Sequence, residues 1–200
     1  WADSVKTLMN SLYDGQNIYF DYSAIRPEGA RLMTMGGRAS GPQPLIKLHD
    51  FIRETLHNAQ GRQLTTLECH DICNQIAEIV VVGGVRRSSQ ISLSDLHDTD
   101  MRHAKEWPFP IKRAMANNSA IYREKPSAAD FLKEWGSLAL SGSGERGIFN
   151  LEAAQSRAPS RRYSPKIEGT NPCGEIMLRD MQFCNLSEVV VREDDDLDTL

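Results

Sequence analysis

Residues 171–175 present three chemically active side chains within one short stretch. Pro172 keeps the preceding residue extended and Gly174 permits a sharp turn, so an amide, a thiol and a carboxylate leave the same loop. A thiol is suited to hydrogen transfer, a neighbouring carboxylate accepts a proton, and an amide orients hydroxyl groups. The candidate catalytic residues are therefore Asn171, Cys173 and Glu175.

Cys184 adds a second thiol eleven residues after the first. If Cys173 lies at the tip of a loop and Cys184 on the strand that returns from it, the two sulfur atoms come close together. The alternative is structural, a simple turn followed by a buried strand cysteine, because free cysteine is among the most buried residue types. The residue pattern alone leaves both interpretations open.

Two further segments combine glycines with arginines and hydroxyl side chains. Backbone amides left free by glycine, together with guanidinium groups, suit a phosphate or a nucleotide. The spacing matches neither the Walker A nor the Rossmann fingerprint, so surface turns with solvated arginines are the alternative. The candidates are Arg26, Gly36, Gly37, Arg38 and Ser40 in the first segment and Gly83, Gly84, Arg86, Arg87 and Ser88 in the second.

The segment Cys69–Cys73 raises the question of a metal site. Its two cysteines, four residues apart, could face one ion on a helix, but His70 lies on a different side. No second cysteine pair stands at zinc-finger spacing. Both cysteines fall on the apolar stripe of a predicted helix, so we expect them to pack in the core and we assign no metal ligands.

Hydrophobic periodicity predicts the elements that must position these residues. Helices are expected over Ala2–Tyr13, over 44–56, from Thr65, where Thr65 and Glu68 form a capping box, and after the cap residue Ser127. Strands are expected over Ile18–Tyr22, Ser89–Leu93, Gly147–Asn150 and Phe183–Val191. The predicted buried faces are Cys69, Ile72, Cys73, Ile76 and Val80 in the third helix and Phe131, Leu132, Trp135 and Leu138 in the fourth. Strands alternating with helices indicate an α/β architecture.

The composition is that of an ordinary globular chain: 200 residues, 40% hydrophobic and 25% charged. A net charge of −4 argues against a general nucleic-acid binder, and no apolar run is long enough for a membrane span. Four unevenly spaced cysteines do not make a disulfide-stapled secreted domain, so we expect a cytoplasmic location. The chain opens on Trp1 without an initiator methionine, and we expect it to be cut from a longer protein.

Several motifs resemble those of ribonucleotide reductases and occur in that family's order. Residues 171–176 followed by 183–186 are similar to the active-site signature, and the intervening spacing resembles that of the adenosylcobalamin-dependent (class II) enzymes. The whole set resembles a central fragment of the monomeric ribonucleoside-triphosphate reductases of the Lactobacillus type. The other matching motifs are Ser23–Gly29, Gly36–Pro42, Gly83–Ser92, Met115–Ser119 and Ser141–Asn150.

This resemblance implies a fold and a role for each candidate catalytic residue. The fold is part of a ten-stranded α/β barrel whose central finger loop carries the radical cysteine. Cys173 matches that cysteine, which becomes a thiyl radical and abstracts the ribose 3′-hydrogen. Glu175 matches the carboxylate that takes the 3′-hydroxyl proton, and Asn171 the amide that binds the ribose hydroxyls. Cys184 matches one half of the redox pair that supplies two electrons as it forms a disulfide.

The resemblance also divides the chain into regions. Residues 1–20 correspond to the end of an insertion that completes the effector site, 21–93 to the effector and specificity loops, and 94–200 to the part of the barrel with the finger loop. The loop 26–42 then belongs to the effector site, and the loop 83–89 stands between effector and substrate. A deoxynucleoside triphosphate at one site thereby biases the base accepted at the other.

The implied cofactor is adenosylcobalamin, whose binding residues fall mostly outside these 200 residues. The implied partners are a ribonucleoside triphosphate substrate, a dNTP effector and a thioredoxin-like reductant, with neither nucleic acid nor membrane. The full-length enzyme is expected to be a monomer and the chain by itself to be inactive. The partner of Cys184 is expected upstream of Trp1, since Cys69 and Cys73 match no redox cysteine of the family.

Two other functions stay open at this point. One is a non-catalytic dNTP-binding regulatory module, against which the intact 171–175 stretch argues, because such a module does not need it. The other is a ribonucleotide reductase of another radical class, using a diiron-generated or glycyl radical, which the spacing of Cys173 and Cys184 disfavours.

Overall fold

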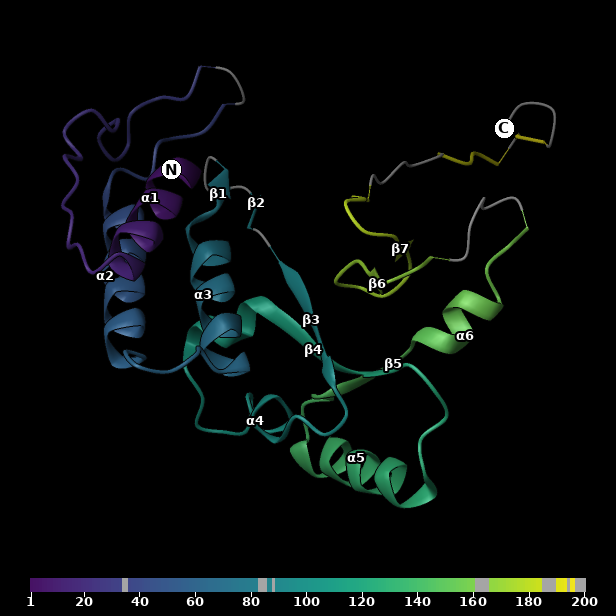
Figure 1. The fold of residues 1–200 in the computed structure, drawn as a ribbon. Coiled ribbons are helices and arrows are strands. Elements are labelled where there is room, and N and C mark those ends of the chain that lie inside the picture. Colours follow the sequence, from purple (N-terminus) through teal and green to yellow (C-terminus); the bar gives the residue numbers. More distant parts are fainter. Residues whose placement is uncertain are drawn as a thin grey trace.

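The computed structural model describes residues 1–33, 36–82, 86–87, 89–160, 166–184, 190–193 and 195–196. Figure 1 shows a group of helices on one side, a small parallel sheet in the middle and a hairpin beyond it toward the C-terminus. In this part of the chain no helix is long and apolar enough to cross a membrane. Three predicted loop residues, Gly83, Gly84 and Ser88, lie outside the described residues.

Helices α1 (Ala2–Tyr13), α2 (Gln43–Asn58) and α3 (Thr66–Ile79) enclose one apolar core and confirm the first three predicted helices. Each brings apolar residues three or four positions apart onto one face. α2 and α3 are joined by the short connection 59–65 and run antiparallel as neighbours (Figure 1). The buried side chains of this core are Leu8, Leu45, Leu48, Ile52, Ile72 and Ile79.

The predicted strand Ile18–Tyr22 is wrong, since this segment is irregular. Its alternating residues Ile18, Phe20 and Tyr22 do pack against the helical core, while Tyr19 is exposed. The alternation therefore reflects burial of one side of the segment. No neighbouring strand pairs with residues 18–22, so they form no strand in the described structure.

The capping box at the start of α3 is confirmed. The Thr65 hydroxyl accepts from the Glu68 N–H, and the Glu68 carboxylate accepts from the Thr65 N–H. The predicted inner face is wrong in part, because Cys69 and Cys73 are exposed. α3 packs against α2 and against the 3-10 turn η1 (Ile111–Met115), which turns a different side inward. The buried positions are His70, Ile72, Asn74, Ala77 and Ile79, whereas Ile76 and Val80 are exposed.

A three-stranded parallel sheet follows, with strand order β3-β4-β5. β3 (Gln90–Asp95) and β5 (Gly147–Asn150) confirm two predicted strands, whereas β4 (Ala116–Tyr122) was not predicted. The connection from β3 to β4 contains α4 (Thr99–Arg102) and η1, and α5 (Ala128–Ser141) lies between β4 and β5. This confirms an α/β architecture. The ten-stranded barrel remains an expectation, because the described sheet holds three strands.

Helix α5 begins at the predicted cap, since the Ser127 hydroxyl accepts from the Asp130 N–H. Its predicted inner face is wrong at three of four residues: Phe131, Leu132 and Trp135 are exposed, and Leu138 is half-buried. The buried position is Glu134, which is fully enclosed. An ion pair therefore determines which side of α5 faces inward.

Glu134 accepts hydrogen bonds from two buried arginines. Arg146 donates from Nε over 2.7 Å and from Nη2 over 2.8 Å, and Arg102 donates from Nε over 2.9 Å. Burial favours the protonated carboxyl, but the hydrogen bonds and positive charges of Arg146 and Arg102 outweigh it and lower the pKa of Glu134. The guanidinium of Arg146 also donates to the backbone carbonyl groups of Asp95, the last residue of β3, and of Leu96, the residue after it.

Beyond β5 the chain forms α6 (Leu151–Ser156) and then a hairpin of β6 (Gly169–Thr170) and β7 (Met177–Leu178). A second apolar core, Ile121, Phe149, Leu151 and Ile167, lies between the sheet and these elements. The predicted strand Phe183–Val191 is not seen at its described residues, because 183–184 and 190–191 are irregular. Its middle, 185–189, lies outside the described residues.

Candidate active site

The candidate catalytic residues lie in the loop that joins β6 to β7. The backbone N–H of Asn171 donates to the Ile176 carbonyl over 3.1 Å, and the N–H of Gly174 donates back to the Asn171 carbonyl over 3.0 Å. Gly174 has a φ of 88°, in the left-handed region that glycine occupies without steric cost. The loop therefore closes on itself, as the predicted turn requires.

Asn171 organises the loop from within. Its side chain is buried, and its Nδ2 donates to Glu175 Oε1 over 2.7 Å. At its other end, Oδ1 accepts from the Ile176 N–H over 3.0 Å. An amide that donates at one end and accepts at the other has a fixed orientation. The sequence predicted an amide and a carboxylate in one loop, and the structure joins the two by this hydrogen bond.

Cys173 is exposed at the apex of the loop and is a free thiol. A methyl group placed on the neighbouring Gly174 would meet nothing within 4 Å, so the space beside Gly174 is open. Glu175 is also exposed. The thiol and the carboxylate are therefore both open to solvent, while Asn171 holds the carboxylate from inside the loop.

Cys184 does not lie on a returning strand. It is half-buried in an irregular segment, and it is a free thiol like Cys173. β7 ends at Leu178, well before Cys184. The strand expected to bring the two sulfur atoms together is therefore not present at these residues, and the closeness of Cys173 and Cys184 stays a prediction.

Two contacts attach the hairpin to the parallel sheet. At its base, Ile167 and Met177 pack in the same apolar cluster as Leu93 of β3. At its loop, the side-chain amide of Asn117 on β4 donates to the Pro172 carbonyl over 2.6 Å. Sequence reasoning missed Asn117 as a site residue. It stands in the motif Met115–Ser119, which carried the family resemblance but no assigned role.

The first glycine-arginine segment folds back on itself. The backbone N–H of Gly29 donates to the Ala39 carbonyl over 2.9 Å, and Arg31 and Arg38 form an antiparallel bridge. Arg38 Nη1 donates to the Gly29 carbonyl over 2.9 Å. Both Gly36 and Gly37 have positive φ. Among the predicted residues, Arg26 and Arg38 are exposed and Ser40 is half-buried.

The second segment lies at the same end of the helical group. β1 (Val81–Val82) pairs antiparallel with β2 (Arg86–Arg87), directly after α3. The first segment leads into the start of α2. Because α2 and α3 are antiparallel neighbours, the start of one and the end of the other meet at one end, the upper one in Figure 1. The helix pair thus brings together two loops that are some forty residues apart in sequence.

Curated relatives match most of the chain. An adenosylcobalamin-dependent ribonucleoside-triphosphate reductase of Lacticaseibacillus paracasei is 38% identical over 179 residues, 86% of this chain and 23% of the relative. The protein of the same name from Lactobacillus leichmannii is 36% identical over 87% of the chain, and that of Levilactobacillus brevis 32% identical over 94%. The chain is homologous to one segment of these reductases. The resemblance drawn from the motifs is thereby confirmed.

The chain spans about a quarter of the length of the curated reductases that it matches. Neither a protein-family model nor a solved structure matches it. The relatives' name includes adenosylcobalamin, which agrees with the predicted cofactor.

The cysteine pair of α3 takes a different place from the one predicted. Cys69 and Cys73 are exposed and line an open cavity of about 490 Å³ beside β3. Packing around the thiol raises the pKa of Cys73, and the nearby Cys69 raises it further. Among the described residues, no three His, Cys, Asp or Glu side chains gather where they could hold a metal ion.

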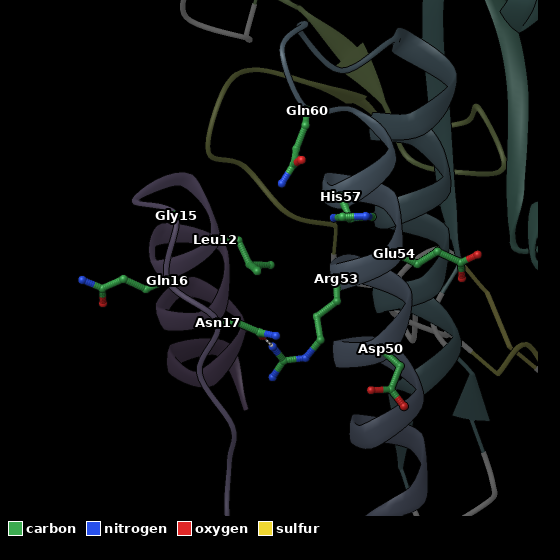
Figure 2. Close-up of a pocket in the computed structure, with 9 residues that line it drawn as sticks. All are labelled: Leu12, Gly15, Gln16, Asn17, Asp50, Arg53, Glu54, His57 and Gln60. Carbon is green, nitrogen blue, oxygen red and sulfur yellow. Dashed lines mark hydrogen bonds between the residues drawn. The ribbon is translucent and has the colours of Figure 1, made fainter.

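A separate cavity of about 500 Å³ lies between α1 and α2. Figure 2 shows Arg53 of α2 reaching across it toward Asn17, to which it donates a hydrogen bond. The cavity contains none of the candidate residues named from the sequence. Its lining residues are Leu12, Gly15, Gln16, Asn17, Asp50, Arg53, Glu54, His57 and Gln60.

Proposed function

We propose that this chain carries the radical loop of an adenosylcobalamin-dependent ribonucleoside-triphosphate reductase, which converts ribonucleoside triphosphates to 2′-deoxyribonucleotides for DNA synthesis. The observation that carries the proposal is the 2.7 Å hydrogen bond from Asn171 Nδ2 to Glu175 Oε1 beside the exposed thiol of Cys173. The homology of the chain to reductases of this name supports the same conclusion.

Each loop residue has a distinct task in this proposal. Cys173, as a thiyl radical, takes the 3′-hydrogen atom of the ribose. The carboxylate of Glu175 takes the proton of the 3′-hydroxyl group, which helps the 2′-hydroxyl leave as water. The amide of Asn171 binds the ribose hydroxyls and keeps Glu175 in place. Cys184, with a second thiol outside this chain, supplies two electrons and becomes part of a disulfide, which a thioredoxin-like protein then reduces.

The loop suits a radical initiator that must approach the thiol directly. Cys173 is exposed, and the space in front of Gly174 is open. When bound, adenosylcobalamin supplies a radical from its cobalt–carbon bond. On this chain Cys173 is the residue that would receive it, and the residues that hold the corrin are expected in other segments of the enzyme.

The two loops at one end of α2 and α3 form the proposed effector region. Arg26 and Arg38 are exposed there, beside backbone turns made by Gly36 and Gly37. Guanidinium groups and free backbone amides bind phosphate oxygens. We assign the triphosphate of a dNTP effector to the first loop. The second loop, with Arg86 and Arg87, relays effector binding to the substrate.

The test is a chimera in which this chain replaces the matching segment of a full-length relative. We expect adenosylcobalamin-dependent formation of deoxyribonucleotides in the parent chimera and only background turnover in Cys173→Ser. Cys73→Ser, which removes another exposed thiol, serves as the control and keeps full turnover. Retained turnover in Cys173→Ser refutes the assignment.

The same chimera separates catalysis from regulation alone. A non-catalytic dNTP-binding module requires Arg86 and Arg87 for binding and is indifferent to the loss of Cys173 or Glu175. For the proposed reductase we expect instead that turnover of the chimera is lost when either Cys173 or Glu175 is replaced.

A further inference from the structure

We propose that Asn117 is a positioning residue for Cys173: its side-chain amide fixes the peptide that carries the radical cysteine to the parallel sheet. The proposal deepens the proposed function and rests on it for the role of Cys173. Asn117 Nδ2 donates to the Pro172 carbonyl over 2.6 Å. That carbonyl belongs to the planar peptide whose nitrogen is that of Cys173. A donor held on it therefore restricts the direction in which the Cys173 side chain leaves the loop.

The hydrogen bonds inside the loop fix its shape but not its place. They join Asn171 to Gly174, Glu175 and Ile176, all within the hairpin. A loop held by these alone keeps its form while it tilts about its two short strands. The Asn117 amide reaches the loop from β4, 55 residues away in the sequence. It attaches the preformed loop to the sheet.

The strand around Asn117 is held on both sides by a buried ion pair. Lys105 Nζ lies 2.6 Å from Glu145 Oε1, and both side chains are at least four-fifths buried. Lys105 also donates to the Ala116 carbonyl, and Glu145 Oε2 accepts from the Asn118 N–H over 2.9 Å. The peptide groups before and after Asn117 are thus fixed by side chains, so its amide leaves a rigid support. A reacting group is positioned reliably when its supporting residues are themselves locked in place.

The base and the apex of the hairpin are held by different interactions. Ile167 and Met177 place the base in the apolar cluster around Leu93. Asn117 is exposed, so the loss of its amide removes no core packing. Removing the amide is therefore expected to free the apex while the hairpin and the sheet stay folded. This separates a positioning role from a general contribution to stability.

The first experiment measures amide hydrogen exchange in the chain itself, in wild type, Asn117→Ala, Asn117→Asp and Asn117→Gln. The Gly174 and Ile176 amides both donate within the loop. Since loss of one neutral hydrogen bond changes a local equilibrium by roughly fivefold, we expect their exchange to rise about fivefold in Asn117→Ala. Asn117→Asp keeps the size, lacks the donor and repels the Pro172 carbonyl, so the rise is at least as large. Asn117→Gln keeps a donor and shows a smaller rise.

Amides of α2 serve as the internal reference, and Asn17→Ala serves as the control variant. Asn17 is another exposed asparagine, hydrogen-bonded to Arg53 in the helical part of the chain. We expect exchange of the α2 amides to stay unchanged in the Asn117 variants. We expect Asn17→Ala to leave exchange at Gly174 and Ile176 unchanged. Exchange in Asn117→Asp that stays within twofold of wild type overturns the proposal. An equal rise across α2 also overturns it, because it indicates a global role.

The second experiment measures turnover in the chimera. For Asn117→Asp we expect kcat to fall roughly tenfold or more with KM nearly unchanged, and Asn117→Gln to recover part of it. A rise of KM alone contradicts positioning of the thiol. If Cys173→Ser remains active, the proposed function fails, whereas the exchange result still decides whether Asn117 holds the loop.

Discussion

The side-chain amide of Asn171 donates to the carboxylate of Glu175 over 2.7 Å, across a loop whose apex is the exposed thiol of Cys173. The amide is buried and the carboxylate is open to solvent. This arrangement leaves one carboxylate oxygen bound to the protein and the other available to a ligand. In the proposed reaction this free oxygen is the proton acceptor, two residues along the chain from the thiol.

Glu175→Gln tests this carboxylate as the proton acceptor. The amide side chain preserves the size of the residue but cannot take up a proton, so we expect kcat of the chimera to fall about 10²- to 10⁴-fold with little change in KM. Steady-state kinetics of deoxyribonucleotide formation measure both constants. Glu168→Gln, an exposed carboxylate just before β6, is the matched control and retains wild-type turnover. Wild-type kcat in Glu175→Gln contradicts the role.

Arg26→Ala tests the effector loop. Arg26 is exposed, and a guanidinium bound to phosphate contributes enough that its loss weakens dNTP binding about 10- to 100-fold. Titration of the chimera with each dNTP gives the effector affinity, and turnover without effector stays as in the parent. Because coupling between two sites is reciprocal, the substrate's effect on effector affinity shrinks as well. Lys47→Ala, an exposed cation on α2, leaves effector affinity unchanged, and equal losses in both variants count against a specific site.

Glu134→Ala tests the buried ion cluster under α5. Removing the carboxylate leaves Arg102 and Arg146 charged, buried and without their shared partner, so we expect the free energy of unfolding to fall by about 3–5 kcal/mol. Urea unfolding followed by circular dichroism measures it. Glu134→Gln can still accept one hydrogen bond and loses less. Lys133→Ala, the exposed neighbour, changes stability by about 0.5 kcal/mol or less. A loss under 1 kcal/mol in Glu134→Ala shows that the cluster is not needed for stability.

Local sequence rules predicted where α3 and α5 begin, but they did not predict correctly which side of these two helices is buried. The caps at Thr65 and Ser127 act within three residues, so type and spacing are sufficient to find them. The inner face of α5 depends instead on Arg102 and Arg146, which come from other elements. An apolar stripe on a helix predicts burial only when a partner element covers it.

The strand β4 shows the same limit for the sheet. Its first four residues, Ala116 to Ser119, contain two asparagines and carry no strand signal, yet all four pair with β3, and β5 pairs with β4 from Ser119 onward. The candidate site also has one part that local spacing predicts and one part that depends on tertiary structure. Spacing within 171–175 was sufficient to predict that one loop carries the amide, the thiol and the carboxylate, whereas the hydrogen bond from Asn171 to Glu175 became apparent only in the structure. The contribution of Asn117 depends on tertiary structure and became visible only there.

The pH dependence of stability offers a test at the start of α3. The side chain of Arg62 hydrogen-bonds Glu68, the Thr65 N–H adds a second bond, and together they lower the pKa of Glu68 from 4.5 to about 2. A carboxylate with a lowered pKa in the folded state stabilises fully above its unfolded pKa, and this contribution is lost as the pH falls through the folded value. We therefore expect wild type to be more stable than Glu68→Gln at pH 7.

The difference in stability between wild type and Glu68→Gln should shrink as the pH falls from about 4.5 to about 2, because protonation removes the charge that the glutamine already lacks. Urea unfolding at intervals across this range measures it. Glu54→Gln, an exposed glutamate within α2, is the matched control and follows the wild-type profile in this window. Arg62→Gln should weaken the pH dependence in wild type, since it removes the main cause of the lowered pKa of Glu68. A difference between wild type and Glu68→Gln that does not vary with pH contradicts the ion pair as its source.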